Sequence, residues 1–356
     1  MKSVITWTAS RIDVANYCKV KHYLRYVDPS KPKPIYLSVY AKGTLLHTLI
    51  ESFWDRTNQI LTPKWDSPEK FSVAAQGLWK RTLFRDRLIR EKIEKGEKAK
   101  RSPIEWNNEN EKWVILNTLP KICKPLYEKL YSEGPPLYSE VPFDFMFGKR
   151  RFKGRIDEIR LREGKVVIRD YKSGKPIKQG RLGEMKRDFD PQLTFYNAGL
   201  CSLIKDYEEL AVKLGFENRK EFIDGLNVCE DFIEEFFSIE DCSIHQTKRT
   251  KQHLYELLNM IEGTENYTPV SFDEFVSERR EFERGRKCDF CDMKNACKEA
   301  SSLMAKSIEA GIYSDKKCQA YFNFAVPPFA QKPTIEFRQR RLSQEYAKAR
   351  KKGIIV

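Results

Sequence analysis

Apolar and polar positions alternate with a period of two along three segments in the middle of this 356-residue chain. The alternation predicts β-strands near residues 137–147, 151–161 and 165–172, each with one face turned toward a core. The turn Glu163-Gly164-Lys165 separates the last two strands and predicts a hairpin between them. In such a hairpin, Asp157 on one strand comes close to Asp170 on the next.

Helical periodicity replaces this alternation on both sides of the strands. Helices are predicted over residues 10–26, over the segment after 31–34 that contains His47, over 191–204 and over 248–261. Ser10 is a possible cap of the first helix, and Asp190-Pro191 marks the start of the third. Two more strands are predicted at Gly225–Val228 and Phe236–Ile239. This mixture predicts an α/β fold, in which a mixed central sheet is flanked by helices.

Residues 68–132 are helical in pattern and rich in charge, as in the segment Arg85–Lys95. Because they lie between the His47 helix and the strands, we expect an inserted helical subdomain. Two roles remain open for it. It would form one wall of a nucleic-acid channel, or it would be a solvated helical face with ion pairs within the helix.

The composition adds a preference for a polyanionic partner. The chain has 65 Lys and Arg against 51 Asp and Glu, a formal net charge of +14. Such a balance suits nucleic acid, whose phosphates dominate affinity and make it salt-sensitive, although solubility alone can produce the same excess. Basic runs continue in the last residues, at 338–341 and 348–352, and suit nucleic acid, a protein partner or a solvated end.

The location of the protein follows from what opens the chain and from its apolar runs. Met1–Thr6 leads directly into polar residues without the apolar segment of a signal peptide, so we expect a cytoplasmic protein. No apolar run reaches the length that spans a bilayer. An intracellular location in turn disfavours disulfides.

Three side chains of the predicted hairpin suit metal-dependent hydrolysis. Asp157 and Asp170 supply carboxylates, and Lys172 lies two residues after Asp170, on the same face of an extended strand. Hard cations such as Mg²⁺ or Mn²⁺ are held by one or two carboxylates and by phosphate oxygens, and they generate hydroxide from bound water. Lys172 would orient that water or stabilise charge on phosphorus. The alternative is that Asp170 and Lys172 form an ordinary surface ion pair, which is common in a chain with so many charged residues.

Four cysteines have the spacing of metal ligands. Cys288-x-x-Cys291 is followed after five residues by Cys297, and Cys18 lies far upstream. Thiolates at these spacings fit either tetrahedral zinc or an iron–sulfur cluster, and spacing does not separate the two. Either group would join the two ends of the fold and add to its folding free energy. The five remaining cysteines lack ligand spacing and are expected to be small buried side chains.

These motifs together resemble the PD-(D/E)xK nuclease superfamily, in particular the branch of the RecB nuclease domain and the CRISPR-associated RecB-like exonucleases. The resemblance covers about residues 10–300. It is carried, in chain order, by the four motifs Gly43-Thr44-Leu45-Leu46-His47, Gly154-Arg155-Ile156-Asp157, Asp170-Tyr171-Lys172 and Gln192 with Tyr196, and in addition by the cysteines. It implies a restriction-endonuclease-like fold whose termini are stapled by the cluster.

The resemblance also implies roles for individual residues. Asp157, Asp170, the Tyr171 carbonyl and His47 would hold the metal, and Lys172 would serve the water. Gln192 and Tyr196 lie four apart on one helix face, where packing explains Tyr196 equally well. For His47, too, packing in an apolar helix is the alternative to ligation. Glu140 is a further acidic candidate, because related nucleases often carry such a residue just before the core sheet.

For the cysteines, the resemblance favours iron over zinc. Several members of the branch close the catalytic domain with a 4Fe-4S cluster on one N-terminal and three C-terminal cysteines, which here correspond to Cys18, Cys288, Cys291 and Cys297. We expect four parts along the chain: N-terminal helices (1–60), a helical insertion (61–135), the nuclease core with the cysteines (136–300) and a basic extension (301–356), of which the resemblance covers neither the extension nor clearly the insertion.

We therefore expect an Mg²⁺- or Mn²⁺-dependent deoxyribonuclease that acts as an exonuclease on single strands or DNA ends, in DNA processing, recombination or CRISPR- and phage-related metabolism. The chain has no Gly-x-x-x-x-Gly-Lys-Ser/Thr loop, so a helicase or integrase-type partner would supply any motor. The alternatives are an iron–sulfur DNA-binding subunit that cuts little and a zinc-stapled endonuclease. The sequence leaves digestion polarity, exo- or endonucleolytic attack and oligomeric state open.

Overall fold

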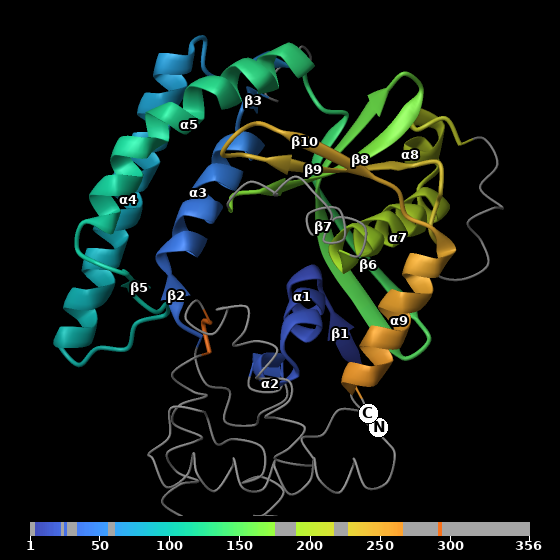
Figure 1. Cartoon of the computed structure of the whole chain (residues 1–356), viewed down its shortest axis with the longest axis horizontal. Coiled ribbons are helices and arrows are strands. Elements are labelled where there is room, and N and C mark those ends of the chain that lie inside the picture. The colour runs from blue at the N-terminus through green and yellow to red at the C-terminus, as the bar shows by residue number, and fades with distance from the viewer. Residues whose placement is uncertain are drawn as a thin grey trace, which may run out of the picture. The chain divides into compact units, whose positions relative to one another are not determined.

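The computed structural model describes residues 4–22, 25–26, 34–55, 61–174, 190–216, 227–265 and 291–293 (Figure 1). The chain divides into two compact units. The first, called here the sheet unit, comprises Met1–Asp13 and Tyr36–Glu262; the second unit comprises Val14–Ile35 and Gly263–Val356.

The strands are β1 (Ile5–Trp7), β2 (Tyr36–Leu37), β3 (Trp54–Asp55), β4 (Thr62–Pro63), β5 (Ile104–Glu105), β6 (Tyr138–Phe147), β7 (Arg150–Arg162), β8 (Lys165–Lys172), β9 (Ile233–Ser238) and β10 (Ile244–Thr247). The helices are α1 (Ala9–Tyr17), α2 (Lys19–His22), α3 (Ser38–Glu51), α4 (Pro68–Glu94), α5 (Glu111–Glu133), α7 (Pro191–Asp206), α8 (Glu208–Lys213) and α9 (Lys251–Glu265). Helices and strands thus interleave along the chain, as the periodicity predicts.

A mixed six-stranded sheet forms the centre of the sheet unit. Strand β7 pairs antiparallel with β6 on one edge and with β8 on the other, β8 pairs parallel with β9, and β9 pairs antiparallel with β10. Strand β1 lies parallel to the first three residues of β7, on the edge that β8 occupies further along. Parallel and antiparallel pairs in one sheet flanked by helices confirm the predicted fold class.

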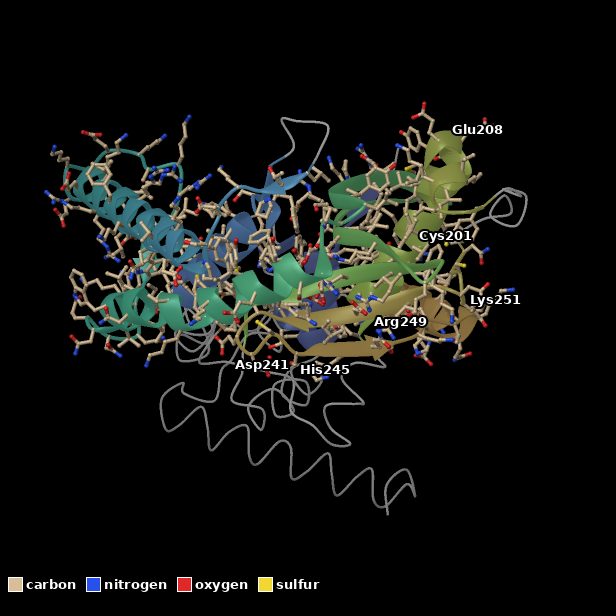
Figure 2. The ribbon with its side chains drawn as sticks, turned by 90° about the horizontal axis from the view of Figure 1, so that it is seen from above. Cys201, Glu208, Asp241, His245, Arg249 and Lys251 are labelled. Atoms are coloured by element: carbon tan, nitrogen blue, oxygen red, sulfur yellow. The ribbon has the colours of Figure 1, made fainter. Side chains whose placement is uncertain are left out.

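On one side of the sheet lie α3, α4 and α5, which pack against one another, with α4 farther from the strands than α3 (Figures 1 and 2). Their apolar faces and the inner residues of β8 and β9 form one core, which includes Leu46, Phe53, Trp79, Leu119 and Tyr171. The charged residues of α4 and α5 lie mainly on the opposite, exposed side of these helices. The amphipathic pattern of residues 68–132 therefore reflects burial of one helix face.

The other face packs against α7, and two glycines make this contact close. A Cβ atom on Gly154 of β7 would lie 2.4 Å from the Phe143 ring, and one on Gly199 of α7 would lie 2.8 Å from the same ring. Phe143 thus fills the space that both glycines leave, and its ring also meets Phe195 with centroids 5.1 Å apart. The first turns of α7 are thereby brought close to β7 and β8.

Several local predictions need correction. Thr8, not Ser10, caps the first helix, since its Oγ1 accepts a hydrogen bond from the Arg11 backbone N–H at 3.2 Å. That helix ends at Tyr17, well before residue 26, and a short α2 follows. No strand occurs at Asn227 and Val228, although β9 is close to its predicted place; Gly225 and Leu226 lie outside the described residues. The sequence did not predict β1 or β10.

The boundaries predicted for four parts of the chain stay a prediction. Within the sheet unit, α4 and α5 form one body with the sheet, and the basic extension at 301–356 lies outside the described residues. None of the helices in the described ranges is both long and apolar enough to cross a membrane.

Candidate active site

The predicted site residues meet where β7 changes its neighbour. On one edge, β1 pairs with Arg150–Phe152 and β8 pairs with Glu158–Arg162, so Asp157 lies just before the point where β8 joins. On the other edge, the ladder to β6 skips one position, at which Glu140 and Asp157 face each other. Glu140 has a left-handed backbone there, with φ of 52°. Strain of this kind is often concentrated at functional sites.

Asp157 is held from two directions. Its Oδ2 accepts a hydrogen bond from the Tyr171 backbone N–H at 3.0 Å and lies 3.7 Å from Nδ1 of His47. Burial lowers the pKa of His47, and the nearby Lys172 adds to this effect, although the Asp170 charge and a hydrogen bond to the Tyr171 backbone oppose it. A lowered pKa favours the neutral imidazole, the form that ligates metals.

A glycine sets the distance between α3 and the end of β8. A Cβ atom on Gly43 would lie 2.6 Å from Oγ of Ser173, the residue that follows β8. Gly43 lies one helical turn before His47. The close approach therefore lets His47 reach the backbone of Tyr171, and the glycine in the motif before His47 has a physical reason.

Asp170, Lys172, Gln192 and Tyr196 form a second group. Lys172 Nζ lies 2.7 Å from Asp170 Oδ2 and donates a hydrogen bond to Gln192 Oε1 at 2.7 Å. Gln192 Nε2 donates to Asp170 Oδ1 and to the Tyr196 hydroxyl, each at 2.8 Å. Both N–H groups and the oxygen of the Gln192 amide thus have partners. The opposite orientation of the amide is unfavourable, because it would place the NH₂ group against the ammonium of Lys172. The group confirms that Asp170 and Lys172 share a face.

The electrostatics of the site are those of two buried acids close together. Burial raises the pKa of Asp157, and repulsion from the Asp170 charge raises it further. Burial likewise raises the pKa of Asp170, although Lys172 opposes this. Burial alone would lower the pKa of Lys172, but the carboxylates of Asp170 and Asp190 raise it above its ordinary value. The positive charge nearby is therefore too small to offset the burial of the two carboxylates, whereas Lys172 stays protonated.

Glu140 lies beside this pair. Its carboxylate is 3.3 Å from Nη1 of Arg155, and its charge contributes to the raised pKa of Asp157. Burial raises the pKa of Glu140 itself, and the charge of Glu51, one helical turn after His47, adds to the effect. The residue predicted with the least support is therefore adjacent to the others.

Sequence reasoning missed the charged groups behind the site. The Tyr171 hydroxyl donates a hydrogen bond to Glu158 Oε2 at 2.6 Å, and Glu158 contacts the fully buried Arg169. Arg169 also pairs with Glu133 at the end of α5 and with Glu235 of β9. Alternation of charged residues with site residues along β7 and β8 was the available signal, but it does not identify the partners.

The chemistry of these residues fits a divalent cation. Asp170 Oδ2 is buried, and its contact with Lys172 lacks hydrogen-bond geometry, so the atom has no hydrogen-bond partner among the described residues. Within the same residues, no three His, Cys, Asp or Glu side chains form a ready-made metal cage. Mg²⁺ and Mn²⁺ do not need one, because they keep several waters and use one or two carboxylates together with substrate oxygens.

Two of the four predicted cysteine ligands are described, and both belong to the second unit. Cys18 and Cys291 lie on segments that Asp292 joins, since its carboxylate is 2.7 Å from both Lys21 Nζ and Arg25 Nη1. Cys18 Sγ accepts a hydrogen bond from the Lys21 backbone N–H at 3.4 Å. Cys288 and Cys297 lie outside the described residues.

Comparison with known proteins bears on the whole of this arrangement. A search of curated proteins found no match. The family model of the PD-(D/E)XK nuclease superfamily matches residues 6–298, a range that includes the sheet, every predicted metal-site residue and all four cysteines. The mixed sheet flanked by helices is consistent with the restriction-endonuclease-like fold of that family. The chain belongs to the PD-(D/E)XK nuclease superfamily.

Proposed function

We propose that this protein hydrolyses phosphodiester bonds in DNA with the help of Mg²⁺ or Mn²⁺, the kind of divalent ion that nucleases of this family use. The observation that carries the proposal is the meeting of Asp157, Asp170 and Lys172 at one place on β7 and β8, with His47 3.7 Å from Asp157. Asp157, Asp170, His47 and the Tyr171 carbonyl would hold the ion. When bound, it would lower the pKa of a water and neutralise phosphate charge.

The residues around the acids would position the reacting groups. Lys172 keeps its proton beside Asp170, so its ammonium is a fixed positive charge for the water or the developing phosphate charge. Gln192 holds both Lys172 and Asp170 in place through its amide. Tyr196 anchors the same amide, so we propose that it positions the site. Glu140 would contribute negative charge beside Asp157.

The substrate proposal follows the charge of the chain and the branch of the family that its motifs resemble. A net charge of +14 suits a nucleic-acid substrate. We propose exonucleolytic attack on single-stranded DNA or DNA ends, with a helicase or integrase-type protein as partner.

A cleavage assay with end-labelled linear and circular DNA tests the catalytic proposal. Wild-type protein with Mn²⁺ or Mg²⁺ should shorten linear strands and leave closed circles intact, and chelation should stop it. Asp170→Asn, which keeps the side-chain shape, should lose the activity. Asp206→Asn, on an exposed residue at the end of α7, is the matched control and should cleave like the wild type. Equal degradation by wild type and Asp170→Asn would overturn the catalytic assignment.

We also propose that Cys18, Cys288, Cys291 and Cys297 bind a 4Fe-4S cluster, with zinc as the alternative. The ion pairs from Lys21 and Arg25 to Asp292 support this, because they join the segments that carry Cys18 and Cys291. Anaerobically purified protein should contain iron and sulfide and absorb visible light. Cys18→Ser should lose the iron, while Cys242→Ser should keep it. Zinc without iron in the wild type would favour the alternative.

A further inference from the structure

The hairpin of β6 and β7 presents a row of positive side chains on its exposed face. Arg151, Lys153 and Arg155 alternate along β7 and are all exposed. Between them, Phe152 is buried and Gly154 lies against Phe143 and Phe195, toward α7. The strand thus has an apolar face under α7 and a basic face that is open to solvent.

The basic row leads directly to the candidate active site. Arg151 lies in the part of β7 that pairs with β1, whereas Lys153 and Arg155 lie between that part and the part that pairs with β8. At its inner end, Arg155 Nη1 is 3.3 Å from Glu140 Oε2, and the charge of Glu140 acts on Asp157. The row is therefore continuous with the acids that would hold the metal.

The positive charges of the row are only partly neutralised. Asp144 on β6 accepts two hydrogen bonds from Arg151, at 2.7 and 2.6 Å, and so neutralises the residue nearest the turn. Lys153 faces Asp144 across the ladder, but no carboxylate in the described ranges forms an ion pair with it. Lys149 adds an exposed cation in the turn. Lys153 is thus the cation in the middle of the row that is left for a ligand.

We propose that this face binds the sugar–phosphate backbone of the nucleic-acid substrate and guides it to Asp157 and Asp170. Alternate residues of a strand are about 6.6–6.8 Å apart, so Lys153 and Arg155 can each contact a different phosphate of one extended chain. Such contacts fix the register of the substrate without reading its sequence. The proposal rests on the nuclease function proposed above and adds the path by which the substrate enters.

The test compares Lys153→Glu with Lys165→Glu, both in the Asp170→Asn background, so that the substrate stays intact. Lys165 is an exposed lysine at the end of the β7–β8 ladder that lies away from the candidate site. Both changes are Lys→Glu, so they alter the net charge equally. Binding of a fluorescent single-stranded oligonucleotide is measured by anisotropy over a range of salt concentrations. Lys153→Glu should weaken binding roughly tenfold and lower the salt slope by about 0.7, the loss of one phosphate contact on a single strand. Lys165→Glu should bind within about twofold of its parent.

Two results would overturn the proposal that the basic row guides the substrate. One is binding by Lys153→Glu with the same affinity and salt slope as its parent. The other is an equal loss of affinity in Lys165→Glu, which would mean that only the net charge matters. Kinetics with an intact Asp170 provide a second measurement, in which Lys153→Glu should raise KM more than it lowers kcat. The two proposals fail separately. If the wild type cleaves DNA but Lys153→Glu binds it normally, only the proposed substrate path is wrong. If the wild type never cleaves DNA, the nuclease proposal is wrong, and the binding comparison still tests the path.

Discussion

We predict that the buried carboxyl of Glu234, which contacts Asn197 of α7, makes the stability of the protein depend on pH. Glu234 lies on β9 and is fully buried, and one oxygen accepts a hydrogen bond from Asn197 Nδ2 at 2.6 Å. Its Oε2 has no partner with hydrogen-bond geometry among the described residues. Burial raises the pKa of Glu234 to about 7, although Asn197, Arg249 and the nearby backbone N–H groups favour the charged form. Arg249, labelled in Figure 2, lies just before α9.

The sign of the effect follows from the direction of this shift. The pKa of Glu234 rises from an ordinary 4.5 to about 7, so the folded protein binds this proton more tightly than the unfolded chain does. The contribution of the protonated Glu234 to the free energy of unfolding is complete below about pH 4.5 and is lost as pH rises through 7. At about 1.4 kcal/mol per pKa unit, the loss amounts to roughly 3 kcal/mol in the free energy of unfolding.

Replacement of Glu234 by Gln tests this reasoning, because the amide cannot ionise. Urea unfolding of the wild type and of Glu234→Gln should give similar free energies near pH 5, and at pH 8 the variant should be more stable by up to roughly 3 kcal/mol. Glu209→Gln, on an exposed carboxylate of α8, controls for the change of charge and should show no such dependence. A difference between the wild type and Glu234→Gln that is constant from pH 5 to pH 8 would refute the argument.

Three further predictions concern packing and reactivity. Gly154→Ala places a Cβ atom 2.4 Å from the Phe143 ring, so its free energy of unfolding should fall by about 1–3 kcal/mol in the same urea assay, and an unchanged midpoint would contradict the close contact. Tyr171→Phe removes the buried hydrogen bond to Glu158 and should cost about 1–3 kcal/mol; a loss below about 0.5 kcal/mol would mean that the hydroxyl is dispensable. Burial raises the pKa of Cys123 to about 12, so a maleimide at pH 8 should label it only after unfolding, as peptide mapping would reveal.

The hairpin at the centre of the site was predictable because its determinants are local. The alternation of β7 and β8 and the turn at Glu163–Gly164 fix the antiparallel pairing, which the structure confirms from Glu158 to Arg169. Spacing alone places Asp170 and Lys172 on one face. The start of α7 at Pro191 was likewise readable, and its cap Asp190 accepts a hydrogen bond from the Gln192 backbone N–H at 2.8 Å.

What the sequence could not supply depends on contacts between distant segments. Strand β1 has only three residues and is specified by its pairing with the start of β7, so no local pattern marks it. The buried charges of Arg169 and Glu235 look like surface residues until their partners are known. Gly43, which the motif before His47 includes, gains its meaning only from its distance to Ser173.

The change of face at Asp157 explains how the site arises on β7. Before Asp157, Phe152 and Gly154 of β7 face α7. After it, Glu158 contacts Tyr171 and Arg169 on the side of the sheet that carries α3 and α5. Phe152, Gly154 and Glu158 are separated by even numbers of residues, so in a regular strand they would share one face. Strict alternation would put Glu158 under α7, so β7 changes face near Asp157, where the ladder to β6 is interrupted while its register stays the same. That change of face lets Asp157 meet His47 from α3 and Tyr171 from β8 at once. The left-handed backbone of Glu140 lies opposite Asp157, at the position where β7 changes face. Because of this change of face, Arg155 at the end of the basic row lies next to Glu140 and the acids of the site, from which a regular strand would separate it.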